Sequence, residues 1–157
     1  MAKVSQRQVL ATIDPVTTGA PKWNEFRFAQ VSGGEITASV EKIYEGGAQF
    51  PTVLCAPYEI GDITLTAHFD DDVTPSDDYN GIAYKLRLLR DRVGKAYYNI
   101  TVATYDCDLK VNGNDRIYSN CLLVGLTEPD GDSSSGAPAT FALTFSVQNV
   151  TGPSTNA

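Results

Sequence analysis

Two segments of the chain alternate apolar and polar residues with a period of two. In residues 62–69, one side of the strand would carry the apolar residues Ile63, Leu65, Ala67 and Phe69. The other side would carry Asp62, Thr64, Thr66 and His68. Residues 141–148 repeat the pattern, with Phe141, Leu143, Phe145 and Val147 on one side and Ala142, Thr144, Ser146 and Gln148 on the other. Because neighbouring side chains of a strand point to opposite faces, both segments predict strands with one buried face and one polar face.

Four more strands are predicted where β-branched and aromatic residues are dense, at residues 24–32, 35–43, 96–109 and 116–126. Asn112-Gly113 supplies the positive-φ residues of a tight hairpin between the last two of these strands. Ser32-Gly33-Gly34 is expected to turn the first strand into the second.

One helix is predicted over residues 76–93. The run Thr74-Pro75-Ser76-Asp77 is a capping signal, and Gly94 is suited to end the helix in a left-handed conformation. Four apolar residues recur at intervals of four, three and four and would share one face of the helix: Ile82, Leu86, Leu89 and Val93. The outer face of the helix is expected to carry the basic side chains Lys85, Arg87, Arg90 and Arg92.

The elements predict a mainly β (α+β) fold, an antiparallel β-sandwich or barrel with one flanking α-helix. A chain of 157 residues fits a single domain, 1–157. Residues 1–20, 131–138 and 151–157 are expected to be flexible, because they are rich in Gly, Ser, Pro or Thr or lack periodicity.

The net charge of −7, from 12 basic and 19 acidic residues, predicts a surface that repels nucleic acid. No apolar run approaches the roughly 20 residues of a membrane helix, and residues 1–7 lack the apolar stretch of a secretory signal, so we expect synthesis in a cytoplasm. The odd number of widely spaced cysteines fits a reducing compartment. We favour buried free thiols for all three cysteines. The alternative that Cys107 and Cys121 face each other across a hairpin stays open.

No catalytic residue, metal site or cofactor is predicted. His68 is the only histidine, so a catalytic constellation has to be built around it, and a polar strand position is the preferred interpretation. A zinc site would need Cys55, Cys107, Cys121 and His68, which lack close paired spacing. The aspartates at 70–72, 77 and 78 lack the ligand alternation of a calcium loop. The basic helix face is a solvated surface, an outer contact with a sheath or, least favoured, a DNA-binding patch.

The middle of the chain resembles the tail tube proteins of phages and related contractile injection systems. The resemblance rests on Tyr44-Glu45-Gly46-Gly47, Phe50-Pro51-Thr52-Val53-Leu54, Ala56-Pro57 and Gly61-Asp62-Ile63-Thr64-Leu65. In that family a strand enters a glycine-containing loop, and a Gly-Asp-Ile-Thr-Leu-like strand follows. The order of predicted elements is similar to the family order across roughly residues 24–150.

The resemblance implies a structural virion protein and not an enzyme. Six copies would form a ring whose strands join into a continuous β-barrel, and stacked rings would form a conduit for genome delivery. DNA would pass the lumen without specific binding, and the tail would assemble in the host cytoplasm. Further partners implied are sheath, tape-measure and baseplate or terminator proteins. The alternatives are the inner tube of a non-phage injection or secretion system, and a monomeric β-sandwich that binds a ligand.

The resemblance also assigns candidate positions. The loop that would contact the adjoining ring contains Tyr44, Gly46, Gly47, Phe50, Pro51, Val53 and Leu54. A place in the protomer's own core remains an alternative for Phe50, Val53 and Leu54. The candidates for the lumen wall are Glu35, Asp62, Thr144, Ser146 and Gln148.

Overall fold

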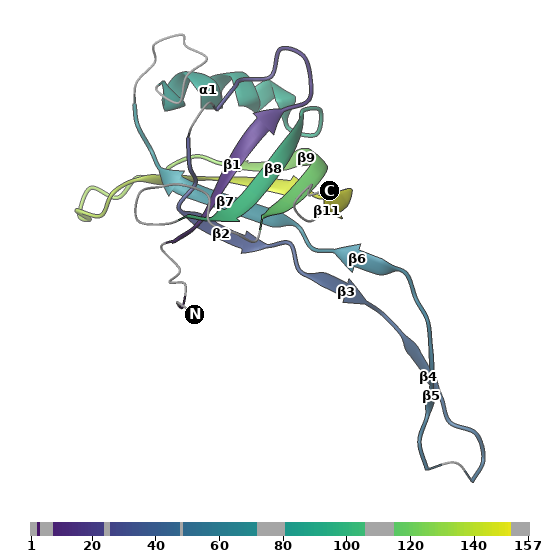
Figure 1. The fold of residues 1–157 in the computed structure, drawn as a ribbon. Coiled ribbons are helices and arrows are strands. Elements are labelled where there is room, and N and C mark those ends of the chain that lie inside the picture. The colour runs from purple at the N-terminus through teal and green to yellow at the C-terminus, as the bar shows by residue number, and fades with distance from the viewer. Residues whose placement is uncertain are drawn as a thin grey trace.

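The computed structural model describes residues 3, 8–23, 26–47, 49–71, 81–105 and 115–151. Its body is a curled antiparallel sheet with a helix at one end, and a long hairpin arm extends from it (Figure 1). The strand order is β1-β8-β9-β10-β7-β2, with β11 paired to β9. These strands are β1 (Val9–Pro15), β2 (Gln30–Gly33), β7 (Ile63–His68), β8 (Tyr97–Thr104), β9 (Arg116–Thr127), β10 (Thr140–Ser146) and β11 (Asn149–Thr151). The predicted mainly β architecture with one helix is therefore confirmed.

The two alternating segments form the adjacent strands β7 and β10. Leu143 pairs with Leu65, and both side chains are buried, as are Ile63 and Phe145. Their alternate residues stay partly accessible on the opposite face of the sheet. This part of the sequence prediction is confirmed because burial on one face reinforces the same period-two pattern in both strands.

Part of the N-terminal segment that was expected to be flexible is a strand. Residues 9–15 form β1, which pairs with β8 along its whole length. Ala11 and Ile13 point into the core and are buried. The expectation of flexibility over 1–20 is therefore wrong for these residues. Only two of the seven side chains are fully buried, which explains why the apolar pattern is weak in the sequence.

The predicted strand at 24–32 is shorter than expected, and residues 24 and 25 lie outside the described residues. Phe28 forms an isolated bridge to Ala11 through two backbone hydrogen bonds, Ala11 N–H to Phe28 O at 3.3 Å and Phe28 N–H to Ala11 O at 2.7 Å. Beyond it the chain enters β2, which pairs with β7. The sheet thus curls until its two outer edges meet at one point.

The arm is formed by two short strand pairs in line, and it projects far from the sheet (Figure 1). Its strands are β3 (Ile36–Ala38), β4 (Glu41–Ile43), β5 (Thr52–Leu54) and β6 (Tyr58–Ile60), and β3 pairs with β6 and β4 with β5. The strand predicted at 35–43 is therefore split in two. The chain reverses at the tip, around Gly46 and Gly47.

Ser32-Gly33-Gly34 does not reverse the chain, so that prediction is wrong. The backbone continues outward from β2 into the arm and returns through β6 into β7. Gly33 and Gly34 have φ of 88° and 77°, and Gly34 N–H donates to Asp62 O at 3.2 Å. The glycines bend the hairpin where the sheet ends and the arm begins, because only glycine adopts this conformation readily.

The helix α1 (Ile82–Leu89) continues into a 3-10 turn, Arg90–Arg92. Ile82, Leu86 and Leu89 are buried, and Val93 packs against the core, as predicted. Gly94 has φ of 82° but does not close the helix as predicted, because the 3-10 turn ends at Arg92, Val93 is extended, and Gly94 N–H donates to Leu123 O at 2.6 Å. The predicted capping segment at 74–77 lies outside the described residues, as do the hairpin residues 112–113. Within the described ranges, no helix has the length and apolarity to cross a membrane.

Candidate assembly surfaces

The arm presents apolar side chains to solvent. Among the described residues, eight of the eleven exposed large hydrophobic side chains are on it: Ile36, Val40, Ile43, Tyr44, Phe50, Val53, Leu54 and Tyr58. A two-stranded hairpin without further packing is at best marginally stable in water, and exposed apolar surface of this extent is typical of an interaction site. The arm therefore exposes apolar surface that the protomer itself does not cover.

The predicted stacking-loop residues all lie at the tip and distal part of this arm. Phe50 is 78% exposed and Tyr44 is 68% exposed, and Pro51 is partly covered. Nothing lies within 4 Å of where a Cβ on Gly46 or Gly47 would be. The alternative that placed Phe50, Val53 and Leu54 in the protomer's core is wrong, because all three side chains are exposed.

The distal strand pair of the arm is apolar on both faces. Glu41 lies opposite Leu54 and Ile43 opposite Thr52, which puts Ile43 and Leu54 on one face. Lys42 lies opposite Val53 on the other face. A hairpin with apolar groups on both faces buries all of them only if it is covered from two sides.

The sheet face opposite the core is rich in hydroxyl groups. The Oγ1 atoms of Thr64 and Thr144 lie 3.4 Å apart on β7 and β10, and Ser32 on β2 is in register with Thr64. The predicted lumen residues Thr144 and Ser146 are half-buried by their neighbours, and Gln148 is exposed. This face therefore offers uncharged polar groups along the middle of the sheet.

The two predicted lumen carboxylates lie at the base of the arm. Glu35 and Asp62 are exposed, and they flank the junction where Gly61 N–H donates to Glu35 O at 2.8 Å. Asp62 has the strand parity of Thr64 and so shares its face of the sheet. Any negative charge they add is placed at the edge of the hydroxyl-rich face.

The outer edge of β2 leaves backbone groups directed away from the sheet. The residues of β2 pair with β7 on one side, from Gln30 opposite Thr66 to Gly33 opposite Ile63, and in the described residues no strand pairs with β2 on its other side. A pocket of about 360 Å³ lies along this edge, lined by Val9, Ala29, Gln30, Val31, Ser32 and Thr66. The edge is thus open to a further strand.

The outer surface of the helix is basic but does not include Lys85. Arg87 and Arg90 are exposed and Arg92 is half-buried, whereas Lys85 is 0% exposed. The prediction that Lys85 belongs to the outer face is wrong, because one helical turn after Gly81 its side chain is directed at the Trp23 ring. Arg90 Nε donates to Glu128 Oε1 at 2.7 Å and ties the helix end to the loop after β9.

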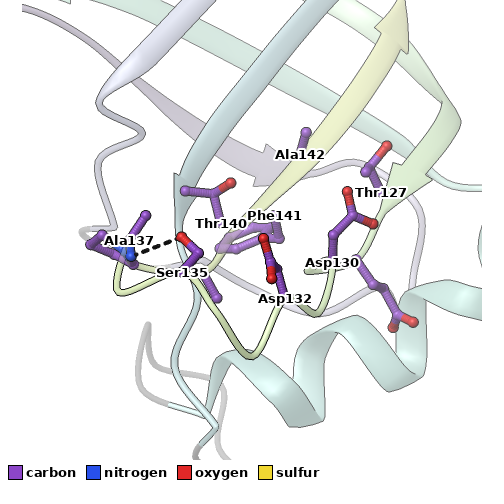
Figure 2. Close-up of a pocket in the computed structure, with 11 residues that line it drawn as sticks. Thr127, Asp130, Asp132, Ser135, Ala137, Thr140, Phe141 and Ala142 are labelled. Atoms are coloured by element: carbon purple, nitrogen blue, oxygen red, sulfur yellow. Dashed lines mark hydrogen bonds between the residues drawn. The ribbon is translucent and has the colours of Figure 1, made fainter.

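A second pocket, of about 280 Å³, lies between the β9–β10 loop and the start of β10 (Figure 2). Its apolar lining includes Phe141, Ala142 and Pro138, and its polar lining includes Asp130 and Asp132. Ser134 donates to Asp132 Oδ1 from its N–H at 3.0 Å and from its hydroxyl at 2.7 Å, which lowers the pKa of that carboxyl. The pocket therefore combines apolar surface with carboxyl groups.

The residues considered for metal binding or catalysis do not lie close together. Cys55 is exposed on the arm, Cys121 is buried in β9, and Cys107 lies outside the described residues. The aspartates at 72, 77 and 78 also lie outside. In the part of the chain that the structure describes, no three His, Cys, Asp or Glu side chains are placed to hold a metal ion.

No protein-family model and no curated protein sequence matches the chain, but solved structures do. A chain from the cryo-EM structure of the anti-feeding prophage baseplate, described as 6-fold symmetrised, matches with a TM-score of 0.72 at 20% identity, covering 97% of this chain and 95% of that one. A chain from the sheath/tube terminator of PVC, an extracellular contractile injection system, matches with a TM-score of 0.73 at 14% identity, covering 98% and 99%. A chain from the PVC sheath-tube complex matches with a TM-score of 0.70 at 14% identity, covering 96% and 90%. The fold is the tail-tube fold.

This result confirms the resemblance on which the sequence prediction rested. The tail-tube fold extends over nearly the whole chain, including β1, which the sequence comparison of elements omitted. The solved neighbours are described as parts of a prophage baseplate and of an extracellular contractile injection system and not as enzymes, which agrees with the non-enzymatic prediction.

The sequence prediction missed four exposed residues of the arm, Ile36, Val40, Ile43 and Tyr58. The sequence did hold a signal for them, because apolar residues recur on both sides of the glycine loop without the polar alternation of a half-buried strand.

Proposed function

We propose that this chain is the tube subunit of a tail-like injection machine, in which six copies form a ring and rings stack into a hollow conduit. The observation that carries the proposal is the arm of the tail-tube fold, whose large apolar side chains are exposed on both of its faces. Such a segment is stable in water only when another molecule covers it.

The arm is suited to contacts between rings. Its outgoing side, residues 34–47, spans up to roughly 45 Å at about 3.3 Å per residue. That reach carries the tip well beyond its own sheet (Figure 1). In a stack of rings it would bring the tip against a neighbouring copy. We propose that the contact is head-to-tail, so that it repeats from ring to ring.

Contacts within a ring would use the open sheet edge. The outer edge of β2, Gln30–Gly33, would offer backbone hydrogen bonds to a strand of the next copy. Closing six curled sheets into one barrel satisfies such edges without leaving a free end. The description of a matching structure as 6-fold symmetrised supports the number six.

The hydroxyl-rich face would line the conduit. Thr64, Thr144 and Ser146 offer no cations, and the chain has a net charge of −7, so DNA would find no counterion-releasing phosphate contacts. We therefore propose passage without specific binding and delivery of a phage genome from the virion tail. Outside, the arginines at 87, 90 and 92 would face a sheath, with tape-measure and baseplate or terminator proteins inside and at the ends.

The inner tube of a non-phage contractile injection system is a second candidate function. The descriptions of the matching structures, which name such systems, favour it. The content of tubes purified from their natural source separates the two functions: encapsidated DNA in an attached head supports the phage tail, and protein cargo without a head supports the injection system.

Assembly is tested with Phe50→Asp, which places a charge at the most exposed apolar position of the arm. We expect the variant to sediment as rings or smaller species where the parent forms tubes, with an unchanged melting temperature, because Phe50 packs against nothing in the protomer. Val16→Asp, at an exposed apolar position outside the arm, is the matched control and should leave tubes intact. Normal tube formation by Phe50→Asp would show that the arm does not stack rings.

A further inference from the structure

The arm and the pocket of the β9–β10 loop lie at opposite ends of the same two strands. The chain leaves the arm at Ile63, where β7 begins, and β7 ends at His68, which pairs with Thr140 beside the pocket. Figure 1 shows the arm and the β9–β10 loop at opposite ends of the sheet. In the proposed stack of rings without inversion, the arm tip of one copy would therefore be directed at the pocket end of the next.

The pocket has one carboxylate that its own protomer leaves without an ion pair. Glu128 is bridged to Arg90, and Asp132 accepts hydrogen bonds from Ser134. Asp130, which Figure 2 shows beside Thr127, makes no ion pair with any described residue. The accessible apolar part of the lining is formed by Pro138 and Ala142, since the Phe141 side chain is buried in the core. Such a site suits an aromatic ring that is accompanied by a cation.

The arm offers that combination at its distal end. Lys42 is the only lysine or arginine between residues 34 and 62, and it makes no ion pair with any described residue. Tyr44 follows two residues later and is 68% exposed. Residues two apart on an extended segment point to the same side. The ammonium group and the tyrosine ring are thus presented together.

We propose that the pocket of the β9–β10 loop is the receptor for the arm of a second copy, with Tyr44 against Pro138 and Ala142 and Lys42 paired with Asp130. The proposal rests on the proposed stacking of rings and names the partner surface of the arm. The volume of about 280 Å³ accommodates one aromatic side chain, and the tyrosine hydroxyl is a hydrogen-bond donor for the carboxylates of the rim.

A charge-reversal cycle tests the pairing. Lys42→Asp and Asp130→Lys are each expected to raise the critical concentration for tube formation by about tenfold or more at low salt, because each places like charges together in the interface. The double variant should return to within about threefold of the parent, since the pair is restored in reverse. Asp91→Lys changes the net charge as Asp130→Lys does, but outside the pocket, and should have little effect. A double variant no better than the worse single variant overturns the proposal.

Cross-linking separates failure of this proposal from failure of the proposed function. In a Cys55→Ser, Cys107→Ser background, Tyr44→Cys combined with Thr127→Cys should give disulfide-linked ladders in assembled tubes under mild oxidation. Tubes that form normally without ladders contradict the receptor assignment alone. If the parent protein forms no tubes at all, the proposed function itself fails and the receptor assignment falls with it.

Discussion

The Nζ atom of Lys85 lies 5.8 Å from the centre of the Trp23 ring, inside the core. Lys85 is the one buried charged residue in the described part of the chain, and it lies on the same helix face as Leu86 and Leu89. A cation over the face of an indole ring is attracted by the ring quadrupole, more strongly when both are removed from water. The residue that was predicted to face outward thus fastens the helix to the aromatic cluster.

Substitution of Lys85 should cost stability. Lys85→Ala is expected to lower the free energy of unfolding by about 2–5 kcal/mol, because a long buried side chain is removed. Lys85→Met keeps most of the side-chain volume and should lower the free energy of unfolding by less than Lys85→Ala does. The loss caused by Lys85→Met reports on the charge, and the additional loss caused by Lys85→Ala reports on packing. Urea unfolding followed by Trp23 fluorescence measures both. Parental stability of Lys85→Ala would show that the side chain is not held in the core.

The two faces of the helix predict unequal effects of truncation. Leu86 is buried, so Leu86→Ala should lower the free energy of unfolding by about 2–5 kcal/mol. Leu88 is 37% exposed, and Leu88→Ala should cost clearly less than Leu86→Ala. Chemical denaturation of both variants gives the comparison. Equal losses from the two substitutions would contradict the observed orientation of α1.

Substitution by alanine is expected to change the melting temperature at one glycine of the arm and not at another. Gly33→Ala should strongly lower the melting temperature, because φ is 88° and the new Cβ would overlap the Asp62 carbonyl oxygen where the arm leaves the sheet. Gly47→Ala, with φ of 83° and open space around it, should leave the melting of the body unchanged. Thermal unfolding by circular dichroism measures both. A Gly33→Ala protein that melts like the parent contradicts the bend.

The two described thiols should react at very different rates. Burial raises the pKa of Cys121 to about 12 from 9.0, whereas Cys55 is exposed on the arm. In a Cys107→Ser protein, maleimide should modify one thiol in the folded state and a second only after unfolding. Since the folded pKa lies above the unfolded one, the contribution of Cys121 to stability is complete below about pH 9 and is lost as the pH rises towards 12. Two equally reactive thiols at pH 7.5 would refute the burial of Cys121.

The parts of the fold that the sequence predicted are those with strong periodicity. Residues 63–68 and 141–146 bury every second side chain, and the helix buries Ile82, Leu86 and Leu89, so the local pattern and the tertiary packing agree. The left-handed conformation of Gly94 was predictable because glycine adopts it readily, although the residue lies in the turn after the 3-10 segment and not at the helix end.

The remaining features depend on contacts that a local pattern does not contain. β1 buries only Ala11 and Ile13, and its place is set by pairing with β8 far along the chain. Gly33 and Gly34 look like a turn, but their partner across the hairpin is Asp62, which makes them a bend. Lys85 was assigned by its charge, although its position on the helix beside Leu86 and Leu89 pointed inward.

Of the assembly residues, the arm tip was predictable because Phe50, Val53 and Leu54 surround a glycine loop within the tube-like motif. The receptor pocket was not, since Asp130, Pro138 and Phe141 come together only when β9 and β10 pair. A loop rich in Gly and Ser gives no local sign of the surface that it forms with the adjacent strand.

The most direct measurement of the central claim is an electron micrograph of the purified protein, recorded over a series of increasing concentrations. The account predicts annular particles with sixfold symmetry that stack end to end, and class averages in which each arm enters the next ring. A protein that remains a monodisperse monomer by sedimentation and in the micrographs at every concentration would contradict it.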